Sequence, residues 1–178
     1  DIKMKDGNSK DYVIGGGIGL ISSRLNIEGP IVQDKGSFIV TARRTYADLF
    51  LKLSKNQQLK KSILYFYDIN AKANYKIGKR DRLFLSGYFG QDKFGLQDRF
   101  SIVYGNSTGT LRWNHIFSDK LFSNTSFIFN NFNYTIGITQ ASIDVKSVIQ
   151  DFSLKEDLDY YLNSHNKLKF GFLTTFHT

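Results

Sequence analysis

The part of the sequence that decides the fold is residues 151–177, which read DFSLKEDLDYYLNSHNKLKFGFLTTFH. Apolar residues such as Phe152, Leu154 and Leu158 alternate there with polar ones, and the alternation resumes after the polar stretch 163–166. Successive side chains of a strand point to opposite faces. The stretch therefore predicts a hairpin of two strands, each with one apolar face and one polar face.

The same alternation recurs along the chain and predicts about nine strands. We place them at 1–6, 11–31, 37–46, 63–77, 82–93, 100–117, 121–134, 143–162 and 167–178. Short polar turns are expected at 33–36, 78–81, 118–120 and 163–166. Longer connections are expected near 47–62, 94–99 and 135–142, with a short helix within 49–59. Tight turns that alternate with longer loops are typical of outer-membrane barrels.

Composition and strand length favour the same class. Aromatic residues make up 15% of the 178 residues, with 16 Phe and 10 Tyr, and there is a single Pro. The strand at 63–77 alternates regularly over about thirteen residues, more than the usual five or six of a soluble strand. A soluble sandwich hides its apolar face in a core, whereas a membrane barrel turns that face to lipid. We predict an all-β fold built from antiparallel transmembrane β-barrel strands.

Several functions are disfavoured by the residues present. The net charge is +8, but Lys and Arg are scattered over polar faces and turns, which argues against nucleic-acid binding. There is no Cys, and His115, His165 and His177 lack the spacing of metal ligands, so we expect no metal site and no cofactor. The glycine run at 15–19 is followed by strand-like residues rather than a helix, so it is no phosphate loop. We find no catalytic constellation and expect no enzyme activity.

Arg24, Glu28 and Arg43 are the candidate residues of the barrel lumen or of a contact with a plug domain. Arg43 and Arg44 are consecutive, so only one of the two can face the lumen. An inward arginine is expected to pair with Glu28 on the preceding strand or with an acidic residue of the plug. The ligand-binding residues cannot be assigned from the sequence.

Four segments carry a family resemblance: DIKMKDGN (1–8), GGIGLISSRLNIEGPI (16–31), DKGSF (34–38) and ARRTYADL (42–49). They resemble the early barrel strands of TonB-dependent outer-membrane receptors of the Bacteroidetes type. The resemblance implies that residues 1–178 are the N-terminal part of the β-barrel domain of such a receptor. The strands would form an arc of a barrel of about 22 strands, and the plug domain is expected to precede residue 1.

The family implies import of a scarce nutrient, such as a siderophore, a glycan or a peptide, across the bacterial outer membrane. The implied partners are outer-membrane lipid, the TonB–ExbB–ExbD complex acting through the N-terminal part outside this sequence, the small-molecule or oligomeric nutrient and, in some members, a surface lipoprotein lid. Two alternatives stay open. One is a small self-closing outer-membrane porin or adhesin barrel, and the other is a soluble β-sandwich binding module.

Overall fold

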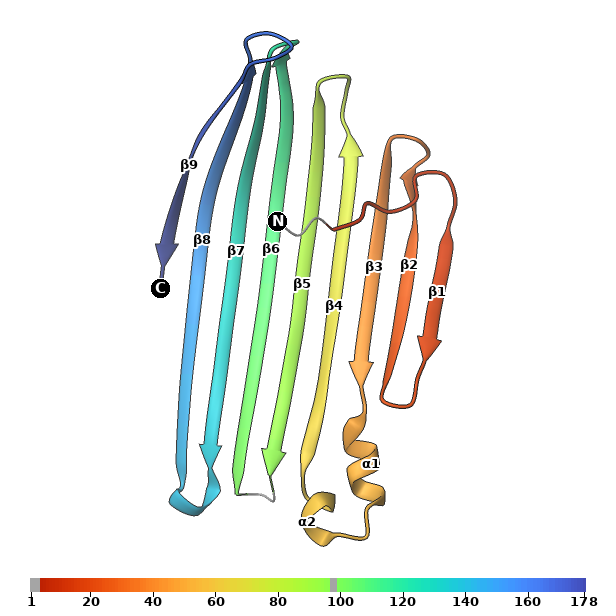
Figure 1. Cartoon of the computed structure of the whole chain (residues 1–178), viewed down its shortest axis with the longest axis vertical. Coiled ribbons are helices and arrows are strands. Elements are labelled where there is room, and N and C mark those ends of the chain that lie inside the picture. Colours follow the sequence, from red (N-terminus) through yellow and green to blue (C-terminus); the bar gives the residue numbers. More distant parts are fainter. Residues whose placement is uncertain (1–3, 97–98) are drawn as a thin grey trace.

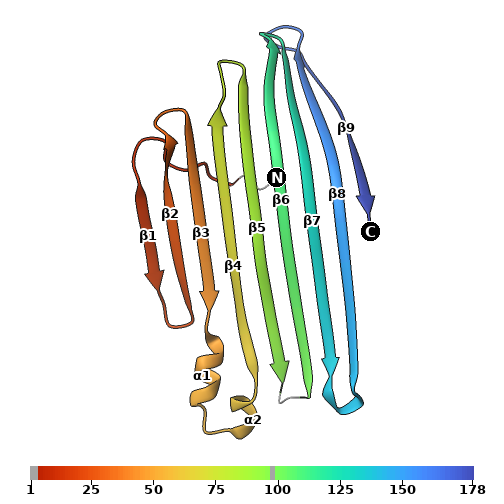
Figure 2. The same cartoon turned by 180° about the vertical axis from the view of Figure 1, so that it is seen from behind.

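The computed structural model describes residues 4–96 and 99–178, which form one antiparallel sheet of nine strands in sequence order (Figures 1 and 2). The all-β class is confirmed. The strands are β1 (Val13–Ile18), β2 (Ser22–Val32), β3 (Gly36–Thr45), β4 (Ile63–Lys76), β5 (Asp81–Leu96), β6 (Phe100–Ser118), β7 (Leu121–Ile138), β8 (Ile143–Tyr161) and β9 (Lys167–His177). In this described part the sheet is open, since β1 pairs with β2 and β9 with β8, but not with each other.

The expected strand number is right only because two errors cancel. Residues 4–12 form no strand, so the strand predicted at 1–6 is wrong where the structure describes it; residues 1–3 lie outside the described part. The single strand predicted at 11–31 is instead the hairpin of β1 and β2. Its turn is closed by a hydrogen bond of 2.8 Å from Gly19 N to Ser22 O. The turn was missed because Leu20 and Ile21 are apolar and continue the look of a strand.

The short turns lie where the sequence predicts them, but of the three longer connections only the one near 47–62 is long. The longer connections expected near 94–99 and 135–142 are wrong: β5 ends at Leu96 and β6 begins at Phe100, and β7 ends at Ile138 and β8 begins at Ile143, because β5 and β7 extend further than the alternation indicates. Short turns join β2 to β3, β4 to β5, β6 to β7 and β8 to β9 at one end of the sheet, the upper end in Figure 1. At the other end lie α1 (Ala47–Leu53), α2 (Gln57–Lys60) and the 3-10 turn η1 (Thr139–Ala141). The helix expected within 49–59 is therefore present as two short helices.

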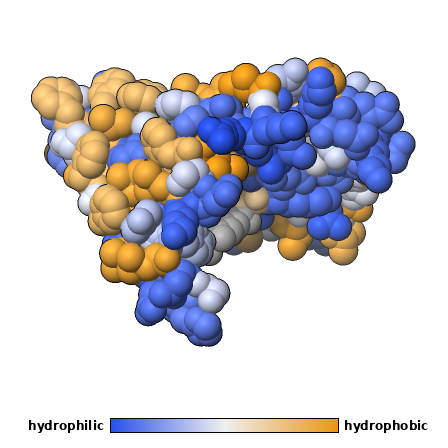
Figure 3. Space-filling model, turned by 90° about the horizontal axis from the view of Figure 1, so that it is seen from above, coloured by the Kyte–Doolittle hydropathy of each residue, from blue (hydrophilic) through white to orange (hydrophobic). Residues whose placement is uncertain are grey.

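The register aligns the strands into one apolar face and one polar face. On the apolar face Leu85, Leu111, Phe127 and Leu154 are successive cross-strand neighbours. Figure 3, which views the sheet from the short-turn end, shows hydrophobic residues gathered mainly on one side and along the edges, and hydrophilic residues over most of the rest. Phe127 is 57% exposed, so nothing in the described part of the chain covers this face. A soluble domain would bury such a face against a second layer.

On β6 to β8 the apolar face ends toward the end of the sheet that carries α1 and α2, whereas on β4 and β5 it continues through Ile69 and Phe89. Its last row across four strands is Gly109, Phe129, Phe152 and Phe176. In the next row on the same face, the polar residues Ser107, Asn131 and Gln150 follow. On β8 this face carries Phe152, Leu154, Leu158 and Tyr160 with Glu156 between them, over about nine residues, which is the length of a membrane-spanning strand.

Candidate functional site

The N-terminal segment, residues 4–12, crosses the polar face of the sheet (Figure 1). Glu28 of β2 anchors it: its carboxylate lies 2.9 Å from Lys5 Nζ and accepts a hydrogen bond of 3.2 Å from the backbone N–H of Asn8. Glu28 is only 5% exposed. A Cβ at Gly7 would overlap the backbone carbonyl of Phe38, so a residue without a side chain is needed where the segment passes β3.

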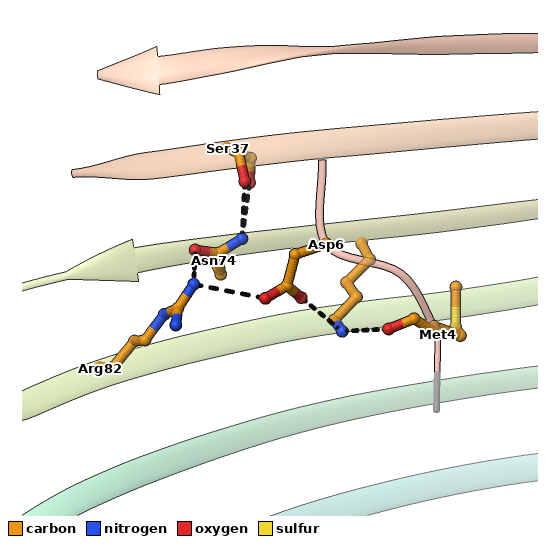
Figure 4. A network of polar contacts seen from close by, with 6 residues as sticks. Met4, Asp6, Ser37, Asn74 and Arg82 are labelled. Atoms are coloured by element: carbon orange, nitrogen blue, oxygen red, sulfur yellow. Dashed lines mark hydrogen bonds and ion pairs between the residues drawn. The ribbon is translucent and has the colours of Figure 1, made fainter. Parts of the chain in front are cut away.

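A second anchor joins the segment to β4 and β5. The Asp6 carboxylate lies 2.6 Å from Lys72 Nζ and 3.4 Å from Arg82 Nη2. Lys72 also donates a hydrogen bond of 2.8 Å to the backbone carbonyl of Met4 (Figure 4). The segment is therefore held to the sheet by ion pairs in which it contributes a cation, Lys5, and an anion, Asp6.

Asn74 of β4 fixes the position of Arg82. Its side-chain oxygen accepts a hydrogen bond of 2.7 Å from Arg82 Nη2, and its amide nitrogen donates one of 2.8 Å to Ser37 Oγ. Asn74 is 4% exposed, and Figure 4 shows it between Ser37 and Arg82. Because a buried polar group without a partner is costly, these bonds restrict the arginine to one orientation.

Three cations surround the ring of Phe84 on the same face. Arg112 Cζ lies 4.3 Å from the ring centroid, Arg82 Cζ 4.8 Å and Lys72 Nζ 5.6 Å. Phe84 is 8% exposed, although it lies on the polar face. The faces of aromatic rings attract cations, and this attraction is stronger where water is excluded. The ring thus collects positive charge that Asp6 neutralises only in part.

The structure places Arg24, Glu28 and Arg43 together on the polar face. Arg24 and Arg43 are direct cross-strand neighbours, and Arg43 Nη2 lies 2.8 Å from the carboxylate of Asp68 on β4. The expected pairing of an inward arginine with Glu28 is wrong, because Lys5 and the N-terminal segment occupy that carboxylate. Arg44 lies opposite Tyr67, on the other face. A contact of the three candidates with a plug or a ligand stays a prediction.

The other sequence motifs carry no separate site. Residues 13–18 of the glycine-rich stretch form β1, with no helix after them. No group of three or more His, Asp or Glu side chains suited to a metal ion occurs in residues 4–96 and 99–178. On the polar face of β8, Lys155 Nζ lies 2.7 Å from the carboxylate of Asp157. Among the described helices, none is long and apolar enough to cross a membrane.

No protein-family model, curated protein or solved structure matches this chain. Its function is therefore inferred from the two faces of the sheet and from the cluster on the polar face.

The sequence did not single out Asp6, Lys72, Arg82, Phe84 and Arg112 as a cluster. For Lys72 the sequence indicates only the face, since alternation in the predicted strand 63–77 places it among the polar residues. Phe84 is an apolar residue at a polar position of the next predicted strand. This exception is the one sign of the cluster in the sequence. Their convergence depends on the register between strands, which alternation alone does not specify.

Proposed function

We propose that this chain is part of an outer-membrane β-barrel receptor that imports a scarce nutrient with energy from TonB. The observation that carries the proposal is the single-layer sheet whose apolar face is aligned across strands and open to the surroundings. Such a face is stable when lipid covers it, and its length of about nine residues on β8 suits the membrane. The polar face would then line the lumen.

The polar cluster supports a receptor that contains an internal body. A segment of the chain already crosses the polar face and is held there through Glu28, Lys72 and Arg82. In a plugged receptor, the wall of the lumen must hold inner segments by polar contacts that can be released, since apolar packing would leave no route for a ligand. The connection of α1 and α2, with the neighbouring connections at the same end of the sheet, would capture the nutrient outside the cell, and a lipoprotein lid would cover them. No covalent chemistry is required.

The test uses the full-length protein that carries this chain. We expect it to fractionate with the outer membrane, to need detergent for extraction, and to support nutrient uptake that is lost when TonB is deleted. As the control for folding, the protein must still be correctly inserted in the membrane of the cells that lack TonB. Recovery of the full-length protein as a soluble monomer would refute membrane insertion, and uptake that is unchanged without TonB would refute the energised mechanism.

A further inference from the structure

A cavity of about 600 Å³ lies on the polar face beside the N-terminal segment. Met4 and Asp6 of the segment form one side of it, and Lys72, Phe84 and Arg112 of the sheet belong to its other walls. Its volume is within the range of small-molecule sites, about 300–1,000 Å³. The cavity is built by residues far apart in the sequence, so it exists only in the folded sheet.

The charges of this cavity do not balance. Lys72, Arg112 and Lys155 line it, and Arg82 lies beside them against the ring of Phe84. Asp6 is the one acidic residue among its described walls, and Lys155 is already paired with Asp157. Arg112 forms no ion pair within residues 4–96 and 99–178, and its Nε is buried without a hydrogen-bond partner. A guanidinium group in this state offers a planar fork of donors that fits a carboxylate.

We propose that this cavity binds a carboxylate-bearing small molecule. One ligand carboxylate is held by Arg112. When the segment 4–8 lifts from the sheet, Lys72 and Arg82 exchange the Asp6 carboxylate for a carboxylate of the ligand. The carboxylate class follows from Asp6, which already shows that this functional group fits between Lys72 and Arg82.

Asp6 is in this scheme an internal competitor of the ligand. Because Asp6 and the ligand use the same cations, ligand binding and release of the N-terminal segment are coupled. Arg82 is close to the short turn that joins β4 and β5, at the end of the sheet opposite α1 and α2 (Figure 1). This inference rests on the proposed function only for its place in transport: the cavity would be a second station for the nutrient, after its capture by the loops.

The test is the binding of succinate to the full-length protein in detergent micelles, measured by calorimetry, with the uncharged diamide succinamide as the control ligand. Met4 is the single methionine of these 178 residues, so its ¹³C-labelled methyl group, assigned with Met4→Leu, reports directly on the cavity. We expect succinate to bind and to shift this resonance, and succinamide to do neither.

Three variants test the assigned roles. Arg112→Gln should weaken succinate binding about tenfold or more, because a charge-assisted hydrogen bond is lost. Asp6→Asn should strengthen binding, because the competitor loses its charge. Lys146→Gln changes the net charge equally on the exposed opposite face, beyond the apolar rows, and should leave the affinity unchanged.

Equal affinity in wild type and Arg112→Gln, or no succinate binding even by Asp6→Asn, would overturn the inference. Inorganic sulfate that binds as tightly as succinate would overturn the choice of carboxylate. Cell fractionation and the dependence on TonB are measured separately. A membrane protein that ignores succinate therefore refutes the site alone, and a soluble protein that binds succinate through Arg112 refutes the proposed function alone.

Discussion

Replacement of Phe127 by arginine tests directly what covers the apolar face. Phe127 of β7 lies between Leu111 and Leu154 in the register and is 57% exposed within the described sheet. If water covered this side chain, the substitution would change the free energy of unfolding by about 0.5 kcal/mol or less, as at most surface positions. If lipid covers it, an arginine one row inside the end of the apolar band should cost clearly more, up to the value of about 2–4 kcal/mol that applies at the bilayer midplane.

Val148→Arg is the matched control. Val148 of β8 is 58% exposed and lies on the same face as Phe127, but beyond the polar row that contains Gln150. Both substitutions replace an apolar side chain of similar exposure by arginine. The main difference between them is therefore their position relative to the apolar band. Near the membrane interface the expected cost falls to about 0–1 kcal/mol.

The assay is guanidinium unfolding of the full-length protein folded into phospholipid vesicles, with the folded fraction read from its mobility on unboiled gels. A cost of about 2–4 kcal/mol lowers the equilibrium constant for folding about 30- to 700-fold, which such a titration resolves. If Phe127→Arg and Val148→Arg differ by less than about 0.5 kcal/mol, the apolar rows do not mark a membrane band. The membrane assignment of this face would then be wrong.

Three further predictions concern individual contacts. Gly7→Val should loosen the N-terminal segment, because its side chain overlaps the Phe38 carbonyl, and should speed amide exchange at Asn8; Gly78→Val, where a Cβ meets no atom within 4 Å, should not. Asn74→Ala should lower the free energy of unfolding by about 1–3 kcal/mol, since it leaves buried partners unpaired; Asn70→Ala removes only a weak bond of 3.4 Å to Asp68 and should cost less in the same denaturant titration. Glu156 is an acidic residue on the apolar face and accepts a hydrogen bond of 2.7 Å from Ser123 Oγ. Ser123→Ala should therefore be more costly in the wild-type background than in Glu156→Leu, by about 1 kcal/mol in a double-mutant cycle; additive effects would show that the pair is not coupled.

Strand positions in the second half of the chain could be predicted closely, because alternation there is strict and the turns contain polar residues. The hairpin of β8 and β9 and its turn at 163–166 are the clearest case. The N-terminal region was less predictable for two physical reasons. Residues 4–6 alternate like a strand but make their contacts through side chains across a face. The turn after β1 contains Leu20 and Ile21, and its backbone hydrogen bond leaves no compositional signal.

The polar cluster shows where sequence reasoning stops. Alternation assigns Lys72 and Arg82 to one face of their strands, but it does not identify their ion-pair partner. Asp6 lies 66 and 76 positions before them, and the contact needs both a chain that folds back over the sheet and the register of β4 with β5. A shift of one residue in that register would turn Arg82 to the apolar face. The site thus depends on the register between the strands, and contacts along the apolar rows specify that register.

Strand direction bears on the choice between a large barrel and a small self-closing one. The nine strands run antiparallel in sequence order, so β1 and β9 point the same way (Figure 1). If these two edges joined, they would form one parallel pair, whereas bacterial single-chain barrels are antiparallel and have even strand numbers. An antiparallel closure therefore needs an odd number of additional strands between β9 and β1. A barrel of about 22 strands meets this condition, since it adds about thirteen. The parity of the sheet thus argues against a porin or adhesin closed by these nine strands alone.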